Sequence, residues 1–171
     1  MLVRRERAGD VAAIRALTIA AFAGADGAEP VEAGLVEDLR ADVGWLPALA
    51  LVAELEGAVV GHVVCTRGFV GEAAALGLGP IGVLPGLQRR GVGSALMHAV
   101  LGAADALGEP LVALLGDPGF YARFGFRAAA EFDISPPVAA WAPHFQVRAL
   151  TAYAPGTAGI FAYAGPFARF M

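Results

Sequence analysis

The chain is unusual for the residue types that it lacks. Its 171 residues include no lysine and no asparagine, so that arginine supplies all twelve strongly basic side chains. Without lysine the chain offers neither a Schiff base nor the lysine of a Walker-type phosphate loop. The net charge is −4, with no basic cluster beyond two or three arginines. This charge balance argues against a nucleic acid as the partner.

Cysteine and long apolar runs are also scarce. The one cysteine, Cys65, cannot form an internal disulfide and gives no metal-site spacing, which fits a reducing cytoplasm. As an acetylated nucleophile, Cys65 would need an activating base, and the sequence places none beside it. No stretch approaches the roughly 18 apolar residues of a membrane-spanning helix, and the first residues lack the apolar core of a secretory signal. We therefore expect a cytoplasmic protein without a membrane segment.

A chain of this length forms one domain, over residues 1–171, with a substantial core. Apolar periodicity and turn residues predict an alternation of strands and helices. We expect helices over 10–21, 31–41, 91–107 and 118–124, and strands over 2–6, 49–55, 58–66, 73–83, 111–115 and 145–150, with another beginning at 126. Gly79 and Pro80 interrupt the fourth of these strands, so we expect a bulge or an outward turn there.

Residues 81–95 form the stretch around which the chain is organised. An apolar strand ends near Val83, a loop with two arginines follows, and an apolar-periodic helix begins just after Gly91. A helix start carries unpaired N–H groups and a partial positive charge, and Gly91 and Gly93 let a bulky anion approach the backbone. The loop therefore predicts a phosphate or pyrophosphate site. An ordinary strand-to-helix turn with glycines for tightness is the alternative.

Two other nucleotide-binding loops do not fit. The third glycine of a dinucleotide fingerprint would fall at Leu96, which is too large for close helix–strand packing. The phosphate loop of nucleotide hydrolases requires a lysine that this chain lacks.

The spacing Gln88-x-x-Gly91-x-Gly93, on a strand followed by Pro85, resembles the coenzyme A loop of the GNAT superfamily of acetyl-CoA-dependent N-acetyltransferases. A second motif over 116–126, Gly-Asp-Pro-Gly-Phe-Tyr-Ala-Arg-Phe-Gly-Phe, resembles the superfamily's closing F-Y-x-x-x-G-F motif. Its Gly-Asp-Pro form is similar to the branch of predicted acetyltransferases called YhbS-like.

This resemblance implies a mixed α/β fold. A central twisted mixed sheet of about six to seven strands is flanked by about four helices, with a V-shaped splay between the fourth and fifth strands. The co-substrate is acetyl-CoA, whose pantetheine arm fills the splay. The residues implied to bind it are Ile81, Gly82, Val83, Gln88, Arg89, Arg90, Gly91, Val92, Gly93 and Ser94.

The resemblance also implies acetyl transfer to an amine by direct attack in a ternary complex. Tyr121 stands at the position of the superfamily's frequent catalytic tyrosine and would protonate the leaving thiolate; a purely packing role is the alternative. The general base is sought at His62 or Glu72, although a structural histidine also fits His62. Asp117, where the superfamily often has asparagine nearby, reads as the cap of the short helix from Pro118.

The acceptor amine is not identifiable from the sequence. Asp26, Glu29 and Glu32 flank the expected acceptor site and could bind a cationic amine, or be solvated surface residues. A domain that binds acetyl-CoA without turnover, as a sensor or regulatory subunit, is the alternative function, and homodimers are common in the superfamily. The aromatic last fifteen residues are expected to pack on the sheet or on a neighbouring subunit.

Overall fold

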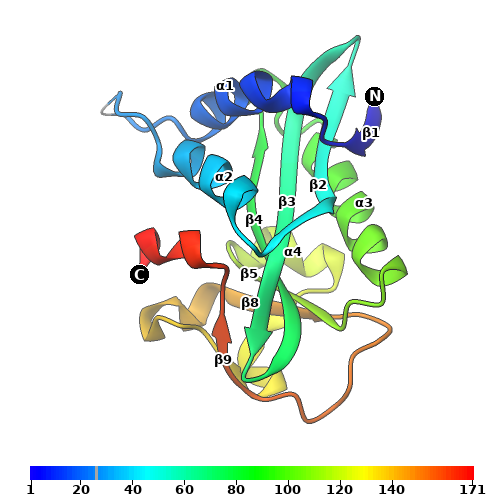
Figure 1. The fold of residues 1–171 in the computed structure, drawn as a ribbon, viewed down its shortest axis with the longest axis vertical. Helices are drawn as coiled ribbons and strands as arrows, with labels where there is room; N and C mark the ends of the chain where they lie inside the picture. The colour runs from blue at the N-terminus through cyan, green and yellow to red at the C-terminus, as the bar shows by residue number, and fades with distance from the viewer. Residues whose placement is uncertain (26) are drawn as a thin grey trace.

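The structure is a computed structural model that describes residues 1–25 and 27–171. Within these residues it contains four α-helices and nine strands (Figure 1). The helices are α1 (Val11–Phe22), α2 (Val31–Ala41), α3 (Val92–Ala106) and α4 (Pro118–Tyr121). The strands are β1 (Leu2–Arg5), β2 (Trp45–Leu55), β3 (Ala58–Val70), β4 (Ala73–Val83), β5 (Leu111–Leu115), β6 (Arg127–Ala128), β7 (Ile134–Ser135), β8 (Phe145–Ala149) and β9 (Gly159–Ala162).

The strands form one mixed sheet. Its main path runs β1-β2-β3-β4-β5-β8-β6, β9 is added beside β3, and β7 pairs with β9. On the main path only β4 and β5 are parallel, as expected for two strands joined by the crossover helix α3. The predicted mixed α/β fold is therefore confirmed. The described residues contain nine strands rather than six or seven because β6 and β7 are two-residue strands and β9 comes from the C-terminal segment.

The parallel pairing between β4 and β5 is very short. Leu76 pairs with Val112 and Gly77 with Ala113, whereas β4 continues to Val83 against β3 alone. The register of β4 on β3 shifts by one residue between the Val63 and Cys65 pairs, which is the bulge expected at Gly79 and Pro80. The expected splay between the fourth and fifth strands is thus present.

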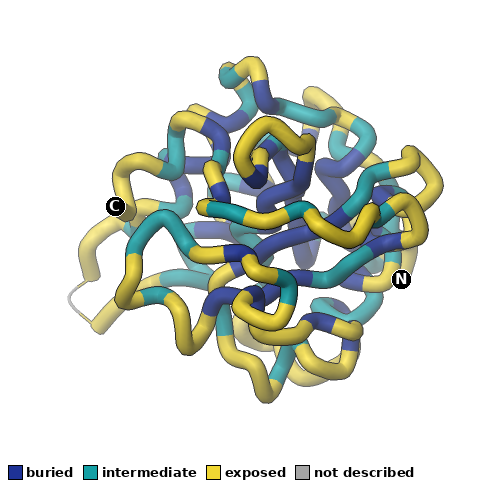
Figure 2. Tube along the Cα trace, turned by 90° about the horizontal axis from the view of Figure 1, so that it is seen from below, coloured by how far each residue is buried: buried dark blue, intermediate teal, exposed yellow. Residues whose placement is uncertain are grey.

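Helices cover both faces of the sheet (Figure 1). Because side chains alternate along a strand, Leu51 of β2 packs in the cluster that includes α3. The next residue, Val52, packs with Ile14 of α1 and Val36 of α2. Buried residues concentrate in the interior and exposed ones in the loops and outer turns (Figure 2). Among the described residues, no helix has the length and apolar character to cross a membrane.

The C-terminal segment folds back onto the domain. Phe161 of β9 is fully buried, and the 3-10 helix η6 (Gly165–Phe170) lies beside α2, where Arg169 forms an ion pair with Asp38 (Figure 1). The aromatic residues of this segment therefore pack on the sheet, which was the first of the two expected arrangements.

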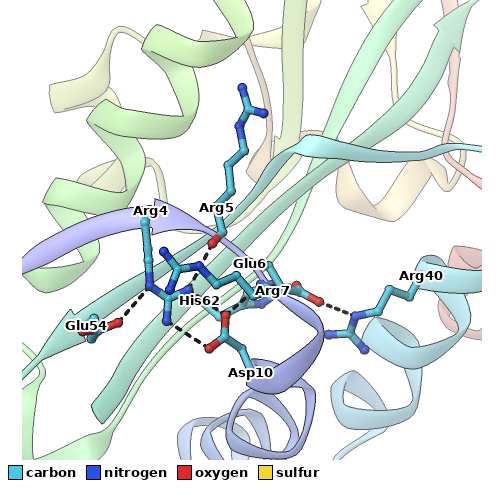
Figure 3. Close-up of polar contacts among 8 residues, drawn as sticks. All are labelled: Arg4, Arg5, Glu6, Arg7, Asp10, Arg40, Glu54 and His62. Carbon is cyan, nitrogen blue, oxygen red and sulfur yellow. Dashed lines mark hydrogen bonds and ion pairs between the residues drawn. The ribbon is translucent and has the colours of Figure 1, made fainter. Parts of the chain in front are cut away.

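A buried polar cluster joins the N-terminal segment to the sheet and to α2 (Figure 3). The Glu6 carboxylate lies 3.1 Å from Nε2 of His62 and accepts a hydrogen bond from Arg40 of α2. His62 is only 1% exposed, so this histidine is a partner of Glu6 in the core. Beside it, Arg4 of β1 donates to Asp10 at 2.7 Å and to Glu54 of β2 at 2.8 Å. Opposite charges are paired throughout, which offsets the cost of removing them from water.

Burial and hydrogen bonds together determine the ionisation of His62 and Glu6. Burial lowers the pKa of His62, although the hydrogen bond and the negative charge of Glu6 oppose the shift. Burial would raise the pKa of Glu6, but its hydrogen bonds to His62 and Arg40 outweigh that effect, and the pKa is lowered. At neutral pH a neutral His62 therefore donates its Nε2–H to an ionised Glu6.

We predict an acid-sensitive stability that depends on His62. A lowered pKa means that unfolding takes up a proton once the pH falls below about 6.5, the ordinary value, so the free energy of unfolding decreases by up to about 1.4 kcal/mol per pH unit. Denaturant unfolding from pH 7.5 to 5 should show this slope in the parent protein. His62→Gln, which keeps an amide donor, should flatten the slope near pH 6, whereas His98→Gln, at an exposed position on α3, should not. An unchanged slope in His62→Gln would contradict the assignment.

Candidate active site

A cleft of about 640 Å³ opens where β4 ends and α3 begins. Seven of the ten residues predicted to bind the co-substrate line it. They are Ile81, Val83, Gln88, Arg89, Gly91, Gly93 and Ser94, and the cleft is completed by Phe120 and Arg123. The strand, the loop and the start of the helix thus meet in one concave site, as the 81–95 stretch predicted.

The loop between β4 and α3 has a constrained backbone. Gly91, the N-cap of α3, has φ 88°, a left-handed conformation that residues with a Cβ rarely adopt. Arg89 has φ 57°, which is uncommon for a residue other than glycine. The side-chain amide of Gln88 donates to the carbonyl of Val83 at 3.1 Å and so ties the loop to the end of the strand. Glutamine and glycine at this spacing therefore build the turn itself.

The turn aims the start of α3 into the cleft. The N–H groups of the first helical residues, Val92, Gly93 and Ser94, have no intrahelical acceptor. A Cβ at Gly93 would be in ordinary van der Waals contact with Val83 and Phe120, 3.8 and 3.9 Å away, so Gly93 lies at the wall of the cleft and its missing side chain leaves the backbone accessible there. Arg89 and Arg123 add positive charge to the partial charge of the helix terminus. The cleft is therefore suited to an anion such as a pyrophosphate.

Three predicted co-substrate residues do not line the cleft. Gly82 is buried against α1, where a Cβ would lie 3.2 Å from Leu17. The Val92 side chain packs in the core, so only its backbone N–H faces the helix start. Arg90 is exposed outside the cleft lining. None of these three residues therefore contributes a side chain to the cleft, and binding through their backbone groups stays a prediction.

Backbone groups of β4 also face the splay. The Leu84 N–H donates to the Val60 carbonyl of β3. The backbone groups of successive residues in a strand point to opposite sides. The peptide groups of Ile81 and Val83 therefore point away from β3, toward the gap where β5 has diverged. The N–H and C=O of Ile81 and the N–H of Val83 are available to hydrogen-bond a ligand lying along β4, whereas the Val83 C=O already accepts from Gln88.

A second cavity of about 370 Å³ lies on the other side of Ile81, which lines both. Its walls come from β4, the end of β5, α1, α2, α4 and the C-terminal segment. The lining residues are mostly apolar and aromatic: Phe22, Leu35, Leu78, Gly79, Pro80, Ile81, Leu115, Tyr121, Trp141, Tyr163, Phe167 and Phe170, with Glu32.

Tyr121 is at the end of α4 and lines this second cavity. Its ring packs edge-on against Phe120 and Phe126, with centroids 4.9 and 5.9 Å away. A Cβ at Gly116 would lie 2.3 Å from Cε2 of Tyr121, so the ring occupies this position only because residue 116 is glycine. Asp117 accepts a hydrogen bond from the Gly119 N–H at 2.9 Å, which confirms its capping role.

Burial raises the pKa of Tyr121, and the negative charge of Asp117 raises it further. A tyrosine is protonated at neutral pH even at its ordinary pKa, so the phenol can act as a proton donor. Tyr121 shares the lining of the second cavity with Ile81, the residue at which the two cavities meet.

The candidate bases are not brought to this junction. His62 lies in the buried cluster with Glu6 and lines neither cavity (Figure 3). Glu72 is exposed on the turn between β3 and β4, at the opposite end of β4 from Val83. Ten residues of strand separate the two positions, which corresponds to roughly 30 Å. The expectation that either side chain faces the acceptor is not met by the geometry.

The remaining candidates differ in their surroundings. Burial, with the charge of Glu109, raises the pKa of the Cys65 thiol, which leaves Cys65 protonated and enclosed. Glu29 forms an ion pair with Arg15, whereas Glu32 lines the second cavity. Asp26 lies outside the described residues.

Sequence reasoning missed several lining residues. Phe120 and Arg123 flank the predicted tyrosine, and their spacing on a short helix gave no indication that they reach the cleft. Trp141, Tyr163 and Phe167 come from late segments with weak periodicity. The only available signal was the density of aromatic residues near the C-terminus.

Comparisons with known proteins agree with this geometry. Residues 47–128 match the acetyltransferase (GNAT) domain family. Over 173 aligned positions the chain is 34% identical to YhbS of Escherichia coli, an uncharacterized N-acetyltransferase, covering 99% of this chain and all of YhbS.

Two solved structures are similar over nearly the whole chain. The crystal structure of Escherichia coli YhbS in complex with CoA has a TM-score of 0.89 and 32% identity, and covers 99% of this chain and 93% of that one. A GNAT family acetyltransferase from Brucella melitensis in complex with acetyl-CoA has a TM-score of 0.79 and 34% identity, with 97% of each chain covered. Together with the cleft and the splayed strands, these likenesses show that the chain belongs to the GNAT family of N-acetyltransferases.

Proposed function

We propose that this protein transfers an acetyl group from acetyl-CoA to an amine by direct attack in a ternary complex. The observation that carries the proposal is the shared wall at Ile81, which joins a cleft suited to pyrophosphate to a cavity that contains a protonated tyrosine. The complexes of the YhbS and Brucella relatives with CoA and acetyl-CoA support the choice of co-substrate.

The cleft residues bind the co-substrate by complementary charge and hydrogen bonds. The N–H groups at the start of α3 and the guanidinium groups of Arg89 and Arg123 bind the pyrophosphate. The outward-facing peptide groups of Ile81 and Val83 hydrogen-bond the amide-containing arm along β4. This arrangement directs the acyl end toward the second cavity.

The bound thioester supplies an electrophilic carbonyl and a sulfur leaving group. The Ile81 N–H, or a neighbouring one on β4, stabilises the negative charge that develops on the carbonyl oxygen. The amine nitrogen forms the new bond to the carbonyl carbon while the carbon–sulfur bond breaks. Tyr121 gives its proton to the sulfur, and the proton lost by the nitrogen returns through water to the tyrosine. No step involves His62 or Glu72.

The first prediction concerns the pyrophosphate site. Gly93→Glu should weaken CoA binding at least about tenfold, because a carboxylate then faces the bound phosphates at the helix start. Gly102→Glu is the matched control, since it adds the same charge to an exposed position of α3 with no atoms within 4 Å of the new Cβ. Isothermal titration calorimetry measures the CoA affinity of both variants. An equal effect of the two substitutions on this affinity would mean that the cleft is not the CoA site.

The second prediction concerns the proton donor. Tyr121→Phe should lower kcat about 100-fold or more while CoA binding is unchanged, because only the acid is removed. Tyr153→Phe, in the contact with Phe132 away from both cavities, should leave kcat unchanged. Release of the CoA thiol, measured with a chromogenic disulfide, gives kcat for both variants, and calorimetry gives their CoA affinity. A fully active Tyr121→Phe enzyme would rule out Tyr121 as the proton donor. If the parent protein bound CoA but released no CoA thiol from acetyl-CoA with any amine, the sensor function would be favoured.

The third prediction concerns Gly116. Gly116→Ala should displace the Tyr121 ring and lower kcat, with little change in CoA affinity. In the Tyr121→Phe background the same substitution should cause no further loss of kcat, since the hydroxyl is already absent. Additive losses in the double variant would mean that Gly116 acts through another part of the site.

A further inference from the structure

The second cavity is a cage of aromatic rings. Six aromatic residues from four separate segments line it: Phe22, Tyr121, Trp141, Tyr163, Phe167 and Phe170. The ring centroids of Tyr163 and Phe167 lie 4.6 Å apart, and those of Phe167 and Phe170 lie 6.4 Å apart. These contacts fix the rings of the C-terminal segment before a ligand arrives, which lowers the ordering cost of binding.

Part of this apolar lining remains open to solvent. Phe170 is 37% exposed and Leu115, at the end of β5, is 41% exposed. Apolar side chains that face a cavity and stay exposed gain free energy when an apolar ligand covers them.

One charged group faces the cavity among the described lining residues. It is Glu32, in the first turn of α2. Its acidic neighbours Glu29, Glu37 and Asp38 are each ion-paired: Arg15 pairs with Glu29 and Glu37, and Arg169 pairs with Asp38.

Within the described part of the chain, Glu32 itself has no ion-pair partner. A helix start favours an acidic residue in its first turn, but that preference does not explain why this one opens onto aromatic rings. A carboxylate in an aromatic cage is complementary to an organic cation.

We propose that the acceptor is a small primary amine with a flat, apolar body, such as an arylalkylamine. The rings hold the body, Glu32 pairs with the ammonium group, and Tyr121 lines the same cavity. The ammonium gives one proton to solvent water before its nitrogen attacks the thioester, and the second proton follows the route to Tyr121 described above. A volume of about 370 Å³ is in the range of small-molecule sites, so it fits a small amine. This inference rests on the proposed function, because it names the substrate of that site.

Binding can be measured apart from turnover. The chain has two tryptophans, and Trp141 lines the cavity whereas Trp45 does not. In a Trp45→Phe variant saturated with CoA, Trp141 fluorescence should change saturably with 2-phenylethylamine and at least about tenfold more weakly with putrescine. Calorimetry on the unmodified protein repeats the comparison if the variant does not fold.

The carboxylate is tested with a matched pair of variants. Glu32→Gln should weaken 2-phenylethylamine binding about tenfold, as expected for a hydrogen bond between charged groups. Glu37→Gln, on the exposed face of the same helix, should not. The inference is overturned if putrescine binds as well as 2-phenylethylamine, or if Glu32→Gln binds as tightly as the parent.

Release of CoA separates this inference from the function on which it rests. Transfer to polar amines but not to 2-phenylethylamine would overturn the inference and leave the acetyltransferase intact. Saturable binding of 2-phenylethylamine that depends on Glu32, without CoA release, would support the cavity assignment and contradict the proposed function.

Discussion

The short pairing of β4 with β5 is the constraint on which the site depends. Two parallel strands joined by a helix would ordinarily continue side by side, yet these two pair at only two positions before β4 follows β3 alone. The divergence leaves backbone N–H and C=O groups of β4 without a strand partner, and unpaired polar groups of this kind are costly where water is excluded. A ligand with amide groups of its own can complete this edge. The same divergence creates the second cavity, so binding and chemistry share one structural cause.

Close packing then positions the proton donor. Tyr121 is on a helix of only four residues, which by itself would orient a side chain poorly. The missing side chain at Gly116, the cap at Asp117 and the edge-on contacts with Phe120 and Phe126 restrict the ring to one place. Burial in this packing also raises the pKa of the phenol above its ordinary value, which is already well above neutral pH. One set of contacts therefore holds the proton donor in place.

The sequence was sufficient for the parts of the protein that depend on local chemistry. The loop from Gln88 to Gly93 needs a left-handed glycine and a helix start, and both leave a readable spacing. The four helices and the long strands followed from periodicity. The base could not be predicted in this way, because the environments of His62 and Glu72 depend on contacts made by distant segments: His62 meets Glu6, 56 residues away.

The same limit applied to the aromatic cage. Its rings come from α1, from α4, from the segment before β8 and from the C-terminus, and no local pattern relates these segments. The role of Glu32 depends equally on its surroundings, because its acidic neighbours in sequence are paired with arginines and it is not. Composition showed that the aromatics and acids were present, and only the fold showed which of them meet.

Residue-resolved amide hydrogen exchange, with and without CoA, would test the central claim most directly. We predict that the amides of Ile81 and Val83 exchange rapidly in the free protein and become protected when CoA is added. The amide of Gly82, which faces β3, should be protected in both states. Equal protection of all three amides without CoA, or no change at Ile81 and Val83 on its addition, would contradict the claim that the splayed edge of β4 binds the co-substrate.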